Sequence, residues 1–210
     1  MKLYTQHRNS AGERVRIALN LKGLSYHYIS VPALPPGEYR RINPQGLLPA
    51  LEVDGAVIAQ SPAILDFLEQ RWPVPALLPS DPVLRAQALA FGAHIASEMH
   101  AITVSRVRTF LGEELDLSED GVSRWVAHWM NEGLSALEAT LATRQQPWPF
   151  CYGDEPGWAD LHLVPQLSNV RRFGGDLAPY PRLLAVEARC LVLDAFRLAR
   201  PENQPDFPGA

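Results

Sequence analysis

The sequence is poor in several features on which common protein functions depend. Only two of its 210 residues are cysteines, Cys151 and Cys190, and they form no Cys-x-x-Cys pair. A disulfide framework or a thiolate metal site is therefore not expected. No apolar run approaches the roughly 20 residues that a membrane-spanning helix needs. The opening residues, MKLYTQHRNS, contain no apolar segment of the kind found in a secretory signal.

Positive charge is scarce as well. Nineteen Lys and Arg residues face 23 Asp and Glu residues, the net charge is −4, and the basic residues are scattered. A surface that follows a phosphate backbone is therefore not expected. We expect a cytoplasmic globular protein that binds neither nucleic acid nor a membrane and needs no metal.

The order of strand-like and helix-like segments predicts an α/β domain at the start of the chain. Residues 1–5 and 26–31 are typical of short strands on either side of a helix, which makes a β-α-β unit with a parallel strand pair. The runs LPALEV and AVIA, joined by Asp54-Gly55, predict a β-hairpin. The run SPAILDFLEQRW then places Ser61 at an N-cap position and Pro62 at the first position of a helix.

Prolines mark the end of this domain. The stretch PVPALLPSDPV follows residue 72, and everything beyond it has a helical period. We predict a first domain over residues 1–73, a linker over 74–82 and an all-helical domain over 83–210. Helices are expected at residues 81 to about 110, 122 to about 142, 157 to about 173, and as two shorter ones between 181 and about 198. The tail RPENQPDFPGA is expected to be loose.

One acidic residue of the helical part is predicted to serve folding. In the run GWAD, Gly157 stands three residues before Asp160 at the start of a predicted helix. Glycine caps a helix less well than Ser or Thr, but only by a few tenths of a kcal/mol. We therefore expect Asp160 to accept backbone N–H groups at this helix start and to have no catalytic role.

Four stretches of the sequence resemble the glutathione transferase superfamily. They are RVRIALNLKGLSYHYISV, INPQGLLPALEVDG, IAQSPAILDFLEQRWP and ADLHLVPQLSNVRRFGGDLAPYPRL. The resemblance covers nearly the whole chain and implies the glutathione transferase fold: an α/β thioredoxin-like N-terminal domain of order β-α-β-β-β-α, followed by an all-α C-terminal domain. The first and last stretches are similar to the zeta class, which contains the maleylacetoacetate and maleylpyruvate isomerases.

The resemblance implies glutathione as the cofactor and places its binding residues in the first domain. Pro49 occupies the place of the family's cis-proline, where the backbone of Leu48 would pair with glutathione; otherwise Pro49 is an ordinary strand-opening proline. Gln60 and Ser61 would hold the γ-glutamyl end, because a helix N-terminus presents unpaired N–H groups to a carboxylate. A plain N-cap is the alternative for Ser61. Gln45 is a further candidate.

The turn at residues 8–11 is where this family stabilises the thiolate of glutathione. The zeta-class motif reads Ser-Ser-Cys, and aligning the Arg-x-Arg that follows it places Asn9, Ser10 and Ala11 on these three positions. Asn9 could donate a side-chain N–H to the thiolate, or Ser10 could do so if the turn shifts. Ser10 and Glu13 also match a capping box, in which Ser10 would only close its own helix. Without a cysteine here, disulfide exchange of the glutaredoxin type is excluded.

The resemblance also implies a site for a small dicarboxylic electrophile. Such a substrate favours Arg, whose planar fork binds a carboxylate in a bidentate manner. Arg8 in the turn, Arg106 and Arg172 are the candidates, and Arg8 is also the first choice for stabilising charge that develops during the reaction. His100 is implied as a contact to glutathione across a homodimer.

The function implied is a glutathione-dependent cis–trans isomerase of the maleylacetoacetate or maleylpyruvate type, which works by reversible addition of the thiolate. One alternative is a transferase or dehalogenase that acts on another electrophile, and the replacement of Ser and Cys by Asn and Ala favours it. The other is a glutathione-binding protein without turnover. The enzymes must lower the thiol pKa of bound glutathione, whereas the binding protein need not.

Overall fold

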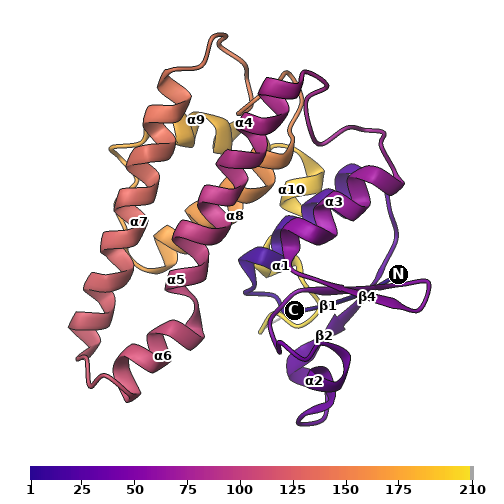
Figure 1. The fold of residues 1–210 in the computed structure, drawn as a ribbon, viewed down its shortest axis with the longest axis vertical. Helices are drawn as coiled ribbons and strands as arrows, with labels where there is room; N and C mark the ends of the chain where they lie inside the picture. The colour runs from indigo at the N-terminus through magenta and orange to yellow at the C-terminus, as the bar shows by residue number, and fades with distance from the viewer. Residues whose placement is uncertain (209–210) are drawn as a thin grey trace. The chain divides into compact units, whose positions relative to one another are not determined.

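The computed structural model describes residues 1–208 (Figure 1). The chain forms two compact units, which we call the N-terminal unit and the helical unit. The N-terminal unit comprises Met1–Leu77 and the segment that begins at Cys190, and the helical unit is Leu78–Arg189. The boundary between Leu77 and Leu78 lies inside the linker predicted over residues 74–82. The sequence-based division placed the C-terminal segment in the helical domain, whereas in the structure it packs with the N-terminal unit.

A four-stranded sheet forms the N-terminal unit, as the sequence predicted. The strands are β1 (Lys2–Thr5), β2 (His27–Ser30), β3 (Ala50–Val53) and β4 (Ala56–Ala59), in the order β2-β1-β3-β4. Strand β1 is parallel to β2 and antiparallel to β3, and β3 and β4 form the predicted hairpin. Its turn residues Asp54 and Gly55 have φ values of 50° and 81°, the left-handed region that such tight hairpin turns require.

Helices cover the two faces of this sheet, because alternate strand residues point to opposite sides. Helix α1 (Ser10–Leu21) and helix α3 (Ser61–Arg71) pack together, and the fully buried Leu3 and Leu51 belong to the unit's core (Figure 1). Tyr4 instead forms a cluster with Tyr39 of helix α2 (Glu38–Ile42), their ring centroids 6.0 Å apart. A short 3₁₀ helix, Val31–Ala33, precedes α2.

Within the N-terminal unit, hydrogen bonds attach the C-terminal segment to strand β2 and to His7, which follows β1. It contains helix α10 (Asp194–Arg197) and a 3₁₀ helix, Pro201–Asn203. The Asp206 carboxylate accepts bonds from the hydroxyls of Tyr28 at 2.7 Å and Ser30 at 2.8 Å, and from the backbone N–H of His7 at 3.3 Å. The prediction of a loose tail is therefore wrong over residues 200–208, because these bonds join residues too distant in sequence to form a local pattern. Its last two positions, 209 and 210, lie outside the described residues.

Replacing Asp206 by Ala should lower the free energy of unfolding by about 2 kcal/mol, since hydrogen bonds to a charged acceptor are lost. Burial acts to raise the pKa of Asp206, but its hydrogen bonds outweigh this effect and lower the pKa. The stabilisation should therefore be present above the ordinary carboxyl pKa and be lost as the pH falls. Urea unfolding measures both effects. The matched control Asp194→Ala removes only an exposed pair with Arg197 and should cost less than about 1 kcal/mol. Equal losses in the two variants would contradict the assignment.

The helical unit contains six α-helices and a π-helical segment within the described residues. They are α4 (Pro82–Ala93), the π-helical segment His94–His100, α5 (Ala101–Thr103), α6 (Ser105–Glu113), α7 (Glu119–Ala142), α8 (Trp158–Arg172) and α9 (Pro181–Leu191), whose last two residues belong to the N-terminal unit. Helix α7 packs against the π-helical segment and α5 (Figure 1). Within residues 1–208, no helix combines the length and hydropathy that crossing a bilayer demands.

The single helix predicted from residue 81 to about 110 is interrupted at Val104. This residue is extended, with φ −67° and ψ 161°, and α6 begins immediately after it. Two local features account for the break. Ile102, Thr103 and Val104 form a β-branched run of low helix propensity. The Thr103 hydroxyl also donates to the carbonyl of Met99 at 2.8 Å, and such back-bonding bends helices.

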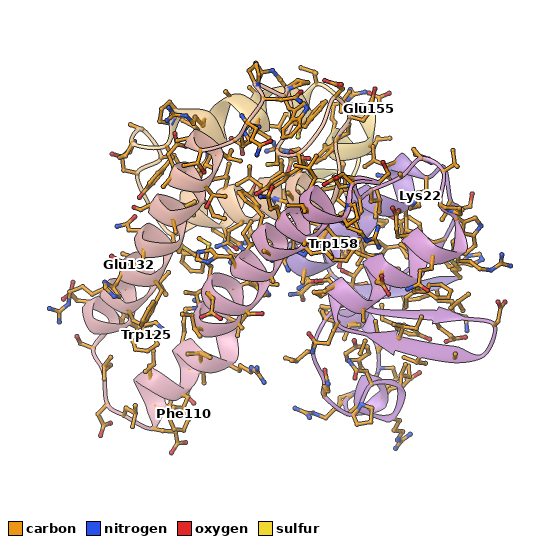
Figure 2. The ribbon with its side chains drawn as sticks, turned by 45° about the horizontal axis from the view of Figure 1, so that its top comes forward. Lys22, Phe110, Trp125, Glu132, Glu155 and Trp158 are labelled. Carbon is orange, nitrogen blue, oxygen red and sulfur yellow. The ribbon has the colours of Figure 1, made fainter. Side chains whose placement is uncertain are left out.

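The start of helix α8 confirms the role predicted for Asp160. Its carboxylate accepts the backbone N–H of Gly157 at 2.8 Å and that of Cys151 at 2.9 Å. Helix α8 also packs closely on α4. A Cβ on Gly92 of α4 would lie 2.5 Å from Nε1 of Trp158 (labelled in Figure 2), so only glycine fits there. Asp160 therefore fixes the start of α8, and Gly92 allows α8 to pack closely on α4.

Candidate functional site

The turn between β1 and α1 is organised by Asn9. Asn9 is the N-cap of α1, with φ −123° and ψ 100°, and its Oδ1 accepts the backbone N–H of Gly12 at 2.6 Å. This corrects the capping box predicted for Ser10 and Glu13, because Ser10 is the first helical residue and is not the cap. Asn caps a helix as well as Ser does, so either residue could have taken the position. Since Oδ1 is engaged, the amide Nδ2 remains as the donor, and no acceptor for it is found within residues 1–208.

Gly12 allows this turn to close. A Cβ at this position would overlap Thr5 Oγ1 and lie 2.5 Å from Oδ1 of Asn9. Any other residue would therefore push the cap away from the end of β1. This role of Gly12 was not predicted, although a glycine directly after the aligned motif is itself a sign of a tight turn.

Arg16 fixes the backbone that leads into the turn. Its guanidinium donates to the carbonyl oxygens of Ala199 at 2.9 Å, Gln6 at 3.3 Å and His7 at 3.3 Å. Arg8 follows directly and is exposed. The predicted catalytic Arg8 therefore stands on a backbone held by a buried cation, with its own side chain open to solvent.

Glu13 brings a second ionisable group into the interior of α1. It is 3 % exposed, and burial raises its pKa to about 7. The charge of Arg16 opposes this rise, as do those of Arg200 and Arg14, whereas Glu202 adds to it. Glu13 is therefore only partly ionised at neutral pH.

Replacing Glu13 by Gln should remove a pH dependence of stability. Between the ordinary pKa near 4.5 and the raised value of about 7, the folded protein holds a proton that the unfolded chain has released. Its contribution to stability is full at low pH and falls by about 2 kcal/mol from pH 5 to pH 7. Urea unfolding at several pH values should show the variant gaining this amount over the wild type. The exposed Glu132→Gln should show no such gain, and a parallel pH profile for Glu13→Gln would contradict the prediction.

The loop before β3 and the start of α3 meet through two glutamines. Nε2 of Gln60 donates to Oε1 of Gln45 at 2.7 Å, and the predicted cis bond between Leu48 and Pro49 is present in the same loop. Gln60 has φ 72° and ψ 118°, a strained conformation for a residue other than glycine. Such strain is concentrated at functional sites.

Helix α3 begins at Ser61, and its N-cap is Gln60. This corrects the prediction that Ser61 is the N-cap. The Gln60 side chain does not cap the helix, so the helix N-terminus remains available to an anion. Ser61 is buried, and its Oγ accepts a hydrogen bond from Nη1 of Arg14 at 3.3 Å. These features fit the α-carboxylate of a γ-glutamyl group.

The predicted substrate arginines of the helical unit lie on two helices. Arg172 ends α8, and its guanidinium carbon lies 4.7 Å from the ring centroid of Phe173. Arg108 of α6 approaches the same ring at 4.8 Å, whereas Arg106 is exposed. The structure therefore brings Arg108 together with Arg172. Arg106 remains a prediction, and the run RVR alone does not show which of its two arginines turns toward Phe173.

His100 ends the π-helical segment and is partly buried. Its carbonyl oxygen accepts a bond from the Thr103 hydroxyl at 3.4 Å. π-Helical turns within α-helices often occur at functional sites. The contact of His100 with glutathione across a dimer remains a prediction.

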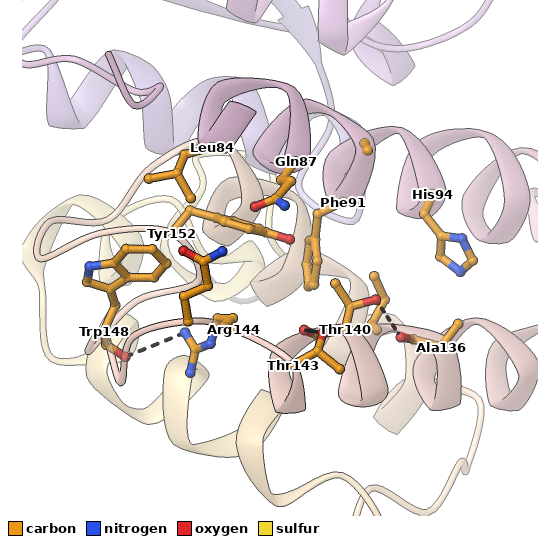
Figure 3. A pocket seen from close by; sticks show the side chains of 13 residues that line it. Leu84, Gln87, Phe91, His94, Ala136, Thr140, Thr143, Arg144, Trp148 and Tyr152 are labelled. Carbon is orange, nitrogen blue, oxygen red and sulfur yellow. Dashed lines mark hydrogen bonds between the residues drawn. The ribbon is translucent and has the colours of Figure 1, made fainter. Parts of the chain in front are cut away.

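A cavity of about 320 Å³ lies within the helical unit, between α4, the end of α7 and the loop that follows it (Figure 3). Phe91 and Tyr152 line it with their rings edge to face, centroids 6.0 Å apart, and Trp148 lies nearby. Arg144 also lines it, but its Nη1 donates to the carbonyl of Phe150 at 2.6 Å. None of the predicted site residues lines this cavity, and the sequence analysis did not anticipate it.

Comparison with known proteins agrees with this geometry. Residues 10–71 match the family model "Glutathione S-transferase, N-terminal domain". The chain is 43% identical to the maleylacetoacetate isomerase of Pseudomonas aeruginosa, over 100% of both chains. A solved holo structure of a maleylpyruvate isomerase, described as a bacterial zeta-class glutathione S-transferase, is 41% identical, with a TM-score of 0.95 over 99% of this chain and 100% of the other.

A further solved structure shows ligands. It is the maleylacetoacetate isomerase of Methylobacterium extorquens with bound malonate and glutathione, 38% identical, with a TM-score of 0.93 over 100% of both chains. The chain described here belongs to the zeta class of the glutathione S-transferase family.

Proposed function

We propose that the protein is a glutathione-dependent cis–trans isomerase of small maleyl dicarboxylates, such as maleylacetoacetate or maleylpyruvate. The names of its full-length relatives support this reaction class. The observation in this chain that carries the proposal is the Asn9 amide, whose oxygen caps α1 and whose N–H group remains to donate. The altered motif thus keeps a donor at the position where the family stabilises a thiolate.

Glutathione supplies the thiol whose thiolate adds reversibly to the cis double bond. The residues that would hold it are the backbone of Leu48, Gln45, Gln60 and Ser61, which lie in two neighbouring segments joined by the Gln45–Gln60 hydrogen bond. Asn9 would donate to the sulfur and favour its ionised form. Each unit by which the thiol pKa falls requires about 1.4 kcal/mol, which a hydrogen bond to a charged acceptor can supply.

Arginine side chains would bind the substrate's carboxylates. Arg8 stands at the turn, and Arg172 and Arg108 share the Phe173 ring in the helical unit. Arg106 remains a candidate from the sequence. The malonate in the Methylobacterium extorquens relative is a small dicarboxylate and supports this substrate class. Arg8 would also stabilise negative charge on the substrate after thiolate addition.

The proposal includes a homodimer in the cytoplasm. His100 would reach the glutathione bound by the partner subunit, as the family resemblance implies. Both cysteines are buried and form no disulfide within residues 1–208, which fits a reducing compartment but does not require one. Light scattering coupled to size-exclusion chromatography tests the dimer, and a monomer at micromolar concentration would contradict this part of the proposal.

An isomerase assay with maleylpyruvate and glutathione tests the function. We expect turnover by the wild type and a loss of about 30-fold in kcat/KM for Arg8→Ala, the worth of a hydrogen bond between charged groups. Arg41→Ala, an equally exposed arginine of the N-terminal unit, should leave the rate unchanged. Absence of isomerisation by a wild type that conjugates another electrophile would favour the transferase alternative. Binding of glutathione with an unshifted thiol pKa would favour the binding protein.

A further inference from the structure

Two arginines of α1 are completely buried, and their surroundings differ. Arg16 is 0 % exposed and donates to four acceptors, three carbonyl oxygens and the Thr5 hydroxyl. Arg14 is 1 % exposed and donates to one acceptor, the Ser61 hydroxyl at 3.3 Å. Its Nε and Nη2 have no partner within residues 1–208. Arg16 is therefore satisfied by the fold, whereas Arg14 is not.

The charge of Arg14 is also incompletely balanced. Glu13 is the acidic group that acts on it, and Glu13 is itself only partly ionised at neutral pH. Burial lowers the pKa of Arg14 to about 10, so its guanidinium stays charged at pH 7. A buried charge without a full partner is costly to folding. An anion bound close to it would lower that cost.

The position of Arg14 indicates where the anion binds. The one side-chain hydrogen bond of Arg14 within residues 1–208 connects it to Ser61, the first residue of α3, where the helix N-terminus has no side-chain cap. Because Arg14 donates to Oγ, the hydroxyl hydrogen of Ser61 is free to point elsewhere. The buried guanidinium itself cannot touch a ligand.

We propose that Arg14 is a positioning residue for the α-carboxylate at the γ-glutamyl end of glutathione. It orients the Ser61 hydroxyl so that the hydrogen donates to the carboxylate, and it places a positive charge beneath the start of α3. This inference rests on the proposed function, because it requires the γ-glutamyl group to lie at Ser61. It adds a residue that selects for the α-carboxylate of the thiol cofactor.

The test compares two ligands that differ only in this carboxylate. Calorimetry gives the Kd of glutathione and of its analogue with 4-aminobutyryl in place of γ-glutamyl. The wild type should prefer glutathione by about 100-fold, and Arg14→Met should weaken glutathione about 30-fold while changing the analogue less than about threefold. Arg14→Lys keeps the charge and should lose less than about tenfold toward glutathione.

Two controls separate this role from a structural one. Arg16→Met removes an equally buried arginine and should leave the ratio of the two Kd values unchanged. If Arg14→Met does not fold, the Arg14→Lys variant decides the question. The proposal then requires weaker binding of glutathione by this variant and an unchanged Kd for the analogue. Equal weakening of both ligands, or an unchanged ratio, would overturn the role of Arg14 and leave the proposed function intact. If the wild type bound both ligands equally, the γ-glutamyl carboxylate would not bind at Ser61. The role of Arg14 and this part of the proposed function would then both be wrong.

Discussion

Lys22→Met should lower the free energy of unfolding by about 4 kcal/mol, because it removes the cation that balances the buried carboxylate of Glu69. The Lys22 side chain is fully buried and donates to Glu69 Oε2 at 2.9 Å, the Trp72 carbonyl at 2.6 Å and the Pro75 carbonyl at 2.8 Å (Lys22 is labelled in Figure 2). All three donors of the ammonium group are therefore satisfied. The backbone N–H of Leu77 also donates to Glu69.

Two control variants test whether burial of the Lys22–Glu69 pair causes the loss, and urea unfolding measures the stability of each. Lys2→Met removes a pair of similar length, 2.8 Å to Glu52, but this lysine side chain is 48% exposed. That variant should cost less than about 1 kcal/mol. The double variant Lys22→Met with Glu69→Leu should recover part of the loss, since no unpaired charge then remains. Similar losses for Lys22→Met and Lys2→Met would show that burial of the pair is not what matters.

Local signals in the sequence were sufficient to predict the fold of the N-terminal unit. The Asp54-Gly55 pair favours a hairpin because both residues readily adopt positive φ. The parallel strands on either side of α1 are joined by a helical crossover, which is the usual connection for such a pair. Asp160 was also predictable, because a carboxylate three residues into a helix can reach the N–H groups at its start. Each of these features depends on residues close together in the chain.

Features that depend on distant residues were missed or misplaced. Asp206 bonds to a strand more than 170 residues earlier, so the tail gave no local sign of order. By residue type, Arg14 and Glu13 are expected on the exposed face of a helix, yet both are buried. The sequence predicts the order of the helices and strands along the chain, but it does not show which of them cover these two side chains. Ser61 and Ser10 both suit an N-cap by residue type. In each case the preceding amide residue, Gln60 or Asn9, holds the N-cap position.

The substitution of Asn for the first serine of the zeta motif changes the chemistry less than the residue types suggest. A serine hydroxyl can accept a helix N–H and donate its own hydrogen at the same time. In the proposed site the Asn9 amide would divide these two tasks between its atoms, because Oδ1 accepts the Gly12 N–H and Nδ2 is left to donate to the thiolate. Capping and thiolate activation can therefore be tested separately in this chain, which a serine would not allow.

The Asn9→Asp variant should separate capping from thiolate activation, and we expect it to lower the activity more than any other variant described here. The carboxylate still accepts the Gly12 N–H and suits a helix N-terminus, so stability should change by less than about 0.5 kcal/mol. It has no N–H to donate and repels a thiolate, so the thiol pKa of bound glutathione should rise. Isomerase kcat should then fall about 100- to 1000-fold, the usual cost of removing one donor to a developing anion. The pH titration of thiolate absorbance, the assay and urea unfolding measure the three quantities.

Two further replacements at position 9 serve as controls for the Asn9→Asp variant. Asn9→Ser should keep both the cap and the activity, because the hydroxyl serves both. Asn9→Ala should lose the activity and also about 1 kcal/mol of stability, because it removes the cap. An Asn9→Asp variant with an unshifted thiol pKa would show that Asn9 only caps the helix. Thiolate activation would then fall to Ser10, the buried first residue of α1.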